Sequence, residues 1–281
     1  MPAPQASAMQ TLAKLKFSSF ALKVPTDWQQ PSGDPAGKHY VDSFPPSERV
    51  AVPDVAVPPL FLPASLNKYH VDTQKNLNQK FGAFIDGVCS AICSAWSTWQ
   101  SSASMTGIMV NAVTASVGQV VGAPWTPLIL ASAPKATPME LLYSTTVANA
   151  VGMGWLSYTA TIKIPGLPFY PAFAAFPGPF AAPVPNVPVP VITLTQVTAT
   201  VGAAYLKNQM VAMLGQPTAP FHKELFESIA DSFEKCFLIW QASTQVTNVL
   251  GMGPIPSFVP PFVPVGPVVG GMANMLPGGF V

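Results

Sequence analysis

Hydrophobic side chains recur at every third or fourth position over two stretches of the chain, Asp72 to Ser101 and Phe221 to Thr244. This spacing places them on one face of an α-helix. In the first stretch the apolar positions are Leu77, Phe81, Phe84, Ile85, Val88, Ile92, Trp96 and Trp99, and in the second they are Leu225, Phe226, Ile229, Phe233, Phe237 and Trp240. The sequence therefore predicts two amphipathic helices.

Two further helices are indicated between these stretches. Thr137-Pro-Met-Glu140 has the form of a capping box with proline at the first helical position, which predicts a helix from Pro138 to about Thr161. A weaker apolar stripe predicts another from Leu194 to Leu214.

The two amphipathic stretches resemble each other. A shift of 141 residues brings Trp99-Gln100 onto Trp240-Gln241, and Gly118-Gln-Val-Val-Gly122 resembles Gly266-Pro-Val-Val-Gly270. One interpretation is an internal pseudo-duplication, in which each copy is a helix followed by an uncharged Gly/Pro-rich arm. The alternative is a chance likeness between two amphipathic helices of similar composition.

Proline interrupts much of the remaining sequence. The chain has 33 prolines, most densely between Ile164 and Val191, and these bar the affected segments from helix. Met105 to Val121 fits either a strand or a helix. The predicted fold class is mainly α, with about four amphipathic helices, long Pro-rich extended arms and little regular strand.

Four segments follow from this pattern. Residues 1–65 are predicted to be an extended N-terminal arm, and 66–134 the first helix with its uncharged Gly/Pro arm. Residues 135–192 are predicted to hold the capped helix and the Pro-rich segment, and 193–281 a helical pair with an uncharged Pro-rich C-terminal arm. We expect 66–281 to form one domain.

Charge is scarce and unevenly placed. Charged residues make up 9% of the chain, against about 25% in ordinary soluble domains. Lysine, arginine, aspartate and glutamate are absent from Gly87 to Pro134, from Ile164 to Leu206 and from Cys236 to Val281. Such a surface has little to prevent association, so we expect neighbouring chains to cover it. The net charge of +1 gives no indication of nucleic-acid binding.

Lipid is the alternative to neighbouring chains as the material that contacts this charge-poor surface. The window Met105 to Val121 contains Thr, Asn, Ser and Gln, and the other apolar windows are cut by proline, so a membrane-associated or pore-forming protein is the second hypothesis. The first 25 residues contain Lys14, Lys16 and Lys23 and no continuous apolar core. We therefore expect synthesis in the cytoplasm without a signal peptide.

No pattern of residues predicts chemistry. The three histidines are far apart, and Cys89, Cys93 and Cys236 lack the spacing of a zinc site and are expected to be small buried side chains. We therefore predict no catalytic residues, no metal site, no cofactor and no enzymatic activity. The tryptophans Trp96, Trp99 and Trp240 could stack on a ring-shaped ligand, which makes a small-ligand binding module the third hypothesis, or they could belong to the core.

The preferred hypothesis is a structural subunit of a large multi-subunit particle, such as a virion, a phage-tail-like particle or a contractile-injection-type assembly. Its partners would be copies of itself, other particle subunits or both, engaged through the Pro-rich apolar arms. The predicted interface residues are apolar or aromatic: Trp96, Trp99, Phe169, Tyr170, Phe173, Phe176, Phe180, Trp240, Phe258, Phe262, Val265 and Val268.

Overall fold

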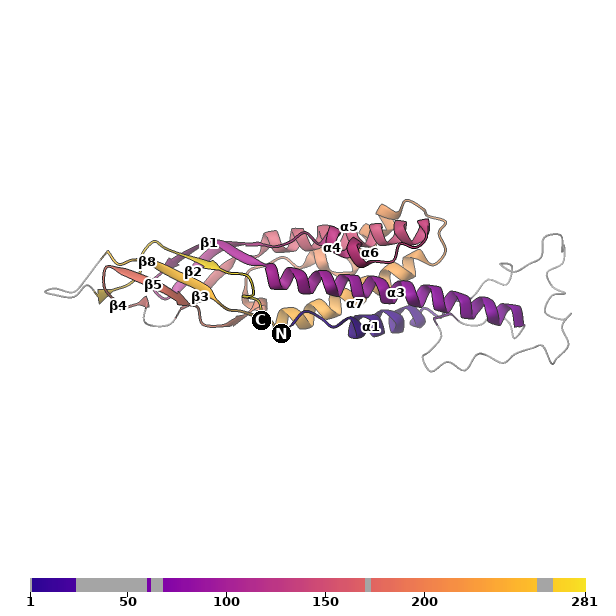
Figure 1. Cartoon of the computed structure of the whole chain (residues 1–281), viewed down its shortest axis with the longest axis horizontal. Helices are drawn as coiled ribbons and strands as arrows, with labels where there is room; N and C mark the ends of the chain where they lie inside the picture. The colour runs from indigo at the N-terminus through magenta and orange to yellow at the C-terminus, as the bar shows by residue number, and fades with distance from the viewer. Residues whose placement is uncertain (1, 24–59, 62–67, 170–172, 257–264) are drawn as a thin grey trace.

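The computed structural model describes residues 2–23, 60–61, 68–169, 173–256 and 265–281. The molecule is elongated, with helices in one half and strands in the other (Figure 1). The helices in the described residues are α1 (Ala6–Ser19), α3 (Lys68–Ser102), α4 (Trp125–Ser132), α5 (Pro138–Thr161), α6 (Ala203–Leu214) and α7 (His222–Ser243), with short 3₁₀ turns η4 (Val191–Thr193) and η5 (Ala199–Val201).

The strand half overturns the mainly-α prediction. Its strands are β1 (Ser104–Asn111), β2 (Thr114–Val121), β3 (Ile164–Pro168), β4 (Phe176–Pro177), β5 (Phe180–Pro185), β6 (Val189–Pro190), β7 (Gln245–Val246), β8 (Val249–Pro254), β9 (Val265–Gly266) and β10 (Gly271–Met275). Six of them form one antiparallel sheet in the order β3-β2-β1-β10-β8-β5, and two short pairs, β4-β9 and β6-β7, accompany it. The segment left open between strand and helix, Met105 to Val121, is the hairpin of β1 and β2.

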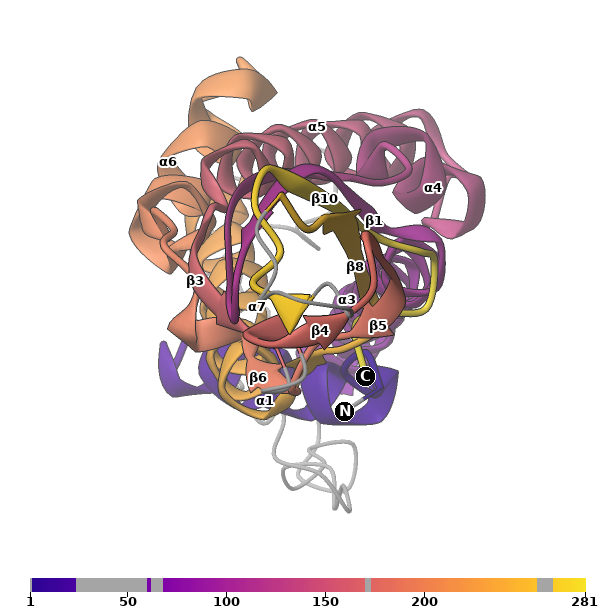
Figure 2. The same ribbon diagram turned by 90° about the vertical axis from the view of Figure 1, so that its left-hand side faces the viewer.

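The Pro-rich segments were expected to be extended arms, but their described parts after Ile164 and around Val249 include the strands β3, β5 and β8 of the chain's own sheet. The Pro-rich residues 170–172 and 257–264 lie outside the described residues. Proline cannot donate to a ladder, so it is tolerated mainly at sheet edges. The sheet obeys this rule, because β3 and β5, each with two or more prolines, are its edge strands. The sheet also curls until these edges meet, where the Val187 amide donates to the Pro168 carbonyl at 2.9 Å (Figure 2).

Three similar units make up the described chain. Each has a short helix, a long helix and two strands of the sheet: α1, α3 and β1/β2, then α4, α5 and β3/β5, then α6, α7 and β8/β10. Each short helix packs against two long helices, α1 against α3 and α7, α4 against α3 and α5, and α6 against α5 and α7. The arrangement is that of a pseudo-three-fold axis running along the molecule, down which Figure 2 looks.

Strand pairing follows the same cycle. The first strand of each unit pairs with the second strand of another, β1 with β10, β3 with β2 and β8 with β5. Positions can be counted from the last residue of each long helix. The third residue after it forms the pairs Met105↔Met275, Ile164↔Val117 and Val246↔Val189. The seventh residue after it forms the pairs Met109↔Met272, Pro168↔Thr114 and Leu250↔Pro185. The units therefore pair in the same way, although the partner strand moves by three residues between these two pairs for β1 and β3 and by four residues from Val246 to Leu250.

This threefold arrangement corrects the expected duplication. Ser102 and Ser243, the last residues of α3 and α7, are separated by the 141-residue shift seen in the sequence, but α5 with its strands forms a third unit. The two Gly-x-Val-Val-Gly segments are not equivalent, because the first ends β2 whereas the second precedes β10.

The capped helix is confirmed. It spans Pro138–Thr161, and both capping-box hydrogen bonds form between Thr137 and Glu140, at 3.1 and 3.0 Å. The two amphipathic helices are also confirmed within a few residues of their expected bounds. The helix expected from Leu194 begins only at Ala203, after Gly202, because the preceding residues form η4 and η5 and an extended link.

The first part of the predicted N-terminal arm is helical. In α1 the side chains of Met9, Ala13 and Phe17, spaced four apart, are buried against α3 and α7. Further along, Phe61 is buried, with its ring 5.4 Å from Phe17 and 5.1 Å from Phe81. The rest of the predicted arm, residues 24–59 and 62–67, lies outside the described residues.

Candidate interaction surface

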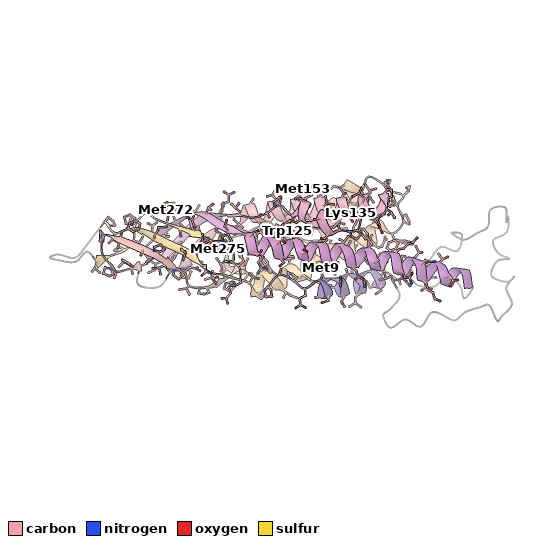
Figure 3. All side chains as sticks on the ribbon, viewed as in Figure 1. Met9, Trp125, Lys135, Met153, Met272 and Met275 are labelled. Atoms are coloured by element: carbon pink, nitrogen blue, oxygen red, sulfur yellow. The ribbon has the colours of Figure 1, made fainter. Side chains whose placement is uncertain are left out.

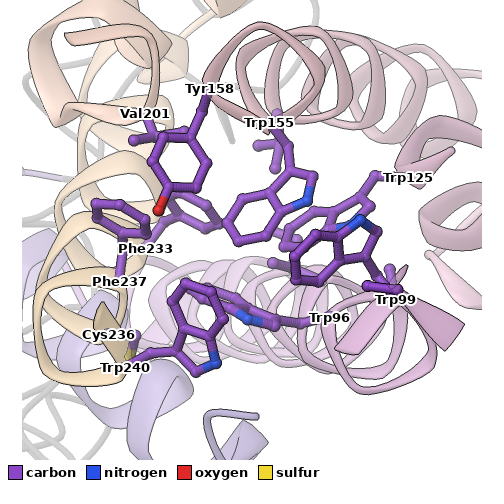
Figure 4. Close-up of a cluster of buried hydrophobic side chains, with 14 of the residues drawn as sticks. Trp96, Trp99, Trp125, Trp155, Tyr158, Val201, Phe233, Cys236, Phe237 and Trp240 are labelled. Carbon is purple, nitrogen blue, oxygen red and sulfur yellow. The ribbon is translucent and has the colours of Figure 1, made fainter. Parts of the chain in front are cut away.

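A cluster of aromatic side chains lies between the last turns of the three long helices, and Figure 4 shows it in close-up. The three units contribute side chains to it from equivalent positions in their long helices. Three residues before the end of each long helix lie Trp99, Tyr158 and Trp240, and six residues before the end lie Trp96, Trp155 and Phe237, all buried. Trp125 of α4 stacks on Trp155 with ring centroids 4.1 Å apart.

Some polar atoms of this cluster are hydrogen-bonded inside the molecule, and others are buried without a partner. Trp240 Nε1 donates to Gln100 Oε1 at 2.9 Å, and Gln100 Nε2 donates to the carbonyl of Phe280 at 3.1 Å. Within the described residues, the indole nitrogens of Trp96, Trp125 and Trp155 have no hydrogen-bond acceptor and are packed among aromatic rings. The cluster is therefore part of the core.

A cavity of about 270 Å³ lies beside the cluster and is lined in part by Trp99 and Trp155. Its two threonine hydroxyls already donate to backbone carbonyls, Thr126 to Ala148 at 3.2 Å and Thr159 to Leu156 at 3.1 Å. This arrangement gives no support to the small-ligand hypothesis.

The structure separates the residues predicted to form an interface. Six are buried in the chain's own core: Trp96, Trp99, Phe169, Phe173, Trp240 and Val268. Phe176 and Val265 are half-buried at the β4-β9 pair, and Phe180 of β5 is 54% exposed. Tyr170, Phe258 and Phe262 lie outside the described residues. Among the nine described members of the set, Phe180 is the one that presents a large apolar surface to solvent.

The outer face of the curled sheet combines exposed apolar side chains with strands that contain no charged residue, while Lys163, directly before β3, donates to the Gly118 carbonyl of β2 at 3.3 Å. From β1 to β2, from β3 to η5 and from β7 to β10 the sequence contains no Lys, Arg, Asp, Glu or His. Met109 of β1 and Met272 of β10 are cross-strand partners, and they are 51% and 67% exposed. Figure 3 labels Met272 in the strand half, far from Lys135 in the helical half.

Sequence reasoning missed this face. In β1 burial alternates from Ile108 to Asn111, so Ile108 and Val110 point inward while Met109 points outward. That alternation is a signal in the sequence, but it extends over too few residues to distinguish strand from helix before the fold is known.

The charged groups are concentrated on the helices. Glu227 of α7 forms ion pairs with Lys16 of α1, at 3.1 Å, and with Lys207 of α6. Hydrogen bonding from Lys207 is the largest influence on this carboxyl group and, with Lys16, holds the pKa of Glu227 below its usual value, although partial burial acts in the opposite direction. Lys14 of α1 pairs with Asp86 of α3 at 2.6 Å. These pairs tie the short helices to the long ones.

The described residues offer neither a metal-binding cluster nor a membrane-spanning helix. No cluster of three His, Cys, Asp or Glu side chains there could hold a metal ion. None of the helices in these ranges has both the length and the apolar character required to cross a bilayer.

No protein-family model, curated protein sequence or solved structure matches this chain. Its function is therefore inferred from its own surface.

Proposed function

We propose that this chain is a structural subunit of a large multi-subunit particle, such as a virion, a phage-tail-like particle or a contractile-injection-type assembly. The same proposal has the chain synthesised in the cytoplasm and incorporated into the particle, where it contacts other subunits, copies of itself or both. We assign it no enzymatic role and no cofactor.

One observation carries the proposal, the exposed apolar outer face of the sheet, whose strands contain no charged residue. Met109 and Met272 lie side by side on this face, and Val117 (51% exposed) and Phe180 (54%) lie on other strands of the sheet. Burying apolar surface contributes roughly 25 cal/mol per Å². In an isolated chain this apolar surface stays in contact with water, whereas packing against neighbouring subunits buries it and stabilises the assembly.

The manner of contact differs from the one expected from the sequence. The sequence suggested interlocking through Pro-rich arms, but the described Pro-rich strands β3, β5 and β8 belong to the chain's own six-stranded sheet. The proposed contact is therefore made by the outer face of the sheet, a preformed surface that requires no ordering of an arm on binding.

Size-exclusion chromatography with light scattering tests the proposal, on the purified chain and on extracts of the cells that encode it. The expected result is a species much larger than the 29.6 kDa chain in the extract. A Met109→Glu/Met272→Glu variant that folds normally should be depleted from that species. A wild-type chain that elutes as a 29.6 kDa monomer in both samples would contradict the proposal.

A further inference from the structure

The pseudo-three-fold fold repeats one surface element three times around the sheet. Each copy is the cross-strand pair at the seventh residue after a long helix, on the outer face. The three strips are Met109/Met272 (strip A), Pro168/Thr114 (strip B) and Leu250/Pro185 (strip C). Four of the six side chains are exposed and the other two, Pro168 and Leu250, are half-buried.

The strips are alike in chemistry as well as in position. Five of the six side chains are apolar, the sixth is threonine, and none is ionisable. A charged partner surface placed against them would lose its hydration without gaining an opposite charge. The surface that complements these strips is therefore uncharged and largely apolar.

Equivalent surfaces related by one axis suit equivalent binders. A partner with a single copy would meet one strip and leave the other two exposed, whereas three identical chains around the same axis would cover all three. Closed symmetric homo-oligomers are the usual form in which identical chains are presented together.

We infer that the outer face of the sheet binds a homotrimer of one uncharged, apolar-faced protein chain, with the trimer's three-fold axis along the pseudo-three-fold axis of this molecule. One copy of this chain then binds each trimer, and the three trimer subunits surround the sheet so that each contacts one strip. This inference rests on the proposed structural role and specifies the symmetry of the neighbouring component.

Native mass spectrometry of the complex tests the ratio. The tagged full-length chain is expressed in the cells that encode it and its assembly is isolated without denaturant. The expected result is one copy of this chain with three copies of a single other chain. Any other ratio overturns the inference, even if another protein is captured.

Three register-equivalent substitutions test whether the strips act equally. Met272→Glu, Thr114→Glu and Pro185→Glu each place a carboxylate on an exposed position of one strip. Burying an unpaired charge in an apolar contact should weaken binding of the trimer by about 30-fold in each case, because the site has no opposite charge. The control Thr218→Glu, on the exposed turn between α6 and α7, should leave binding unchanged.

Folding and alternative binders are checked in the same series. Circular dichroism and the melting temperature show whether each variant keeps the fold. Loss of binding confined to one strip, in variants that remain folded, overturns the threefold assignment. A different result would overturn the assignment in favour of a lipid surface. In that case the wild-type chain co-purifies with no other protein and binds phosphatidylcholine vesicles, and the three Glu variants do not bind these vesicles.

The two proposals fail in different ways. A chain that is monomeric in its own cell extract contradicts the structural role itself. An assembly that contains the chain at a ratio other than one to three leaves the structural role standing and removes only the trimeric partner.

Discussion

Trp240 and Gln100 are 140 residues apart in the chain and joined by a buried hydrogen bond of 2.9 Å from the indole Nε1 to the amide Oε1. The same glutamine donates to the carbonyl of Phe280, so one side chain links α3, α7 and the end of the chain. Both side chains are almost completely buried, with Gln100 7% and Trp240 1% exposed. The link stands where the helical half meets the strands.

Replacing Gln100 with leucine should destabilise the fold. The substitution leaves a buried indole N–H and a buried carbonyl without their amide partner, and each unsatisfied group costs about 1–3 kcal/mol. We expect the free energy of unfolding in urea to fall by about 3 kcal/mol. Gln216→Leu, on the exposed turn after α6, should change it by less than about 0.5 kcal/mol. Equal effects from the two variants would show that the link contributes little.

A second prediction concerns the close approach of α5 to the segment before α6. A Cβ added at Gly154 would lie 2.5 Å from the backbone oxygen of Thr200, whereas one added at Gly166 of β3 would meet nothing within 4 Å. Backbone cannot rotate away as a flexible side chain can, so Gly154→Ala should destabilise by about 1–3 kcal/mol. Gly166→Ala is the matched control and should be nearly neutral. Thermal melting of both variants measures the difference, and a Gly154→Ala protein that melts with wild type would refute the predicted clash.

Helices were predictable from the sequence because their signals are local. The capping box at Thr137 and Glu140 and the long apolar stripes each lie within one element, so their ends came within a few residues of the structure. Helix α1 was missed because only Met9, Ala13 and Phe17 mark its buried face.

The sheet could not be predicted in the same way. Its strands pair between units, as Met109 does with Met272, and the edge prolines of β3 and β5 make those segments resemble unpaired arms. The tryptophans were assigned to an interface because residues at helical spacing look the same whether they face a partner or the chain's own core. The interaction surface was missed because its apolar residues come together only through this pairing.

A third prediction concerns acid pH and Glu227. Its pKa is lowered in the folded chain, so folded-state ion pairing contributes stability above the unfolded pKa of about 4.3 and is lost as the pH falls through the folded value. Partial solvent exposure and screening limit the effect, so Glu227→Gln should cost about 1 kcal/mol at pH 7.

The measurement is the free energy of unfolding of both proteins from pH 7 to pH 2.5. The difference between wild type and Glu227→Gln should shrink toward the acid end, once the wild-type carboxyl group is protonated. Glu234→Gln on the same helix is the control for a general loss of charge. A difference that stays constant with pH would exclude the ion pairs with Lys16 and Lys207 as its cause.

The last prediction concerns the three buried thiols, Cys89, Cys93 and Cys236. Burial raises the pKa of all three, and that of Cys93 rises to about 12. The thiolate is the reactive form, so at pH 8 only about one Cys93 side chain in 10⁴ is reactive in the folded chain. A thiol reagent should therefore label all three cysteines in urea and almost none in the native protein.

The same shifts make the fold sensitive to alkali. An unfolded thiol loses its proton near pH 8.5, whereas the folded one keeps it, so above that pH the unfolded state binds fewer protons and stability falls as pH rises. Each thiol contributes a slope of up to about 1.4 kcal/mol per pH unit until the folded pKa is reached. Cys93→Ala should flatten the slope between pH 9 and pH 11 by that amount, whatever its effect at pH 7. A slope equal to that of wild type, or rapid labelling of the native thiols, would mean that water reaches the space between α1, α3 and α7 where Cys93 packs against Met9.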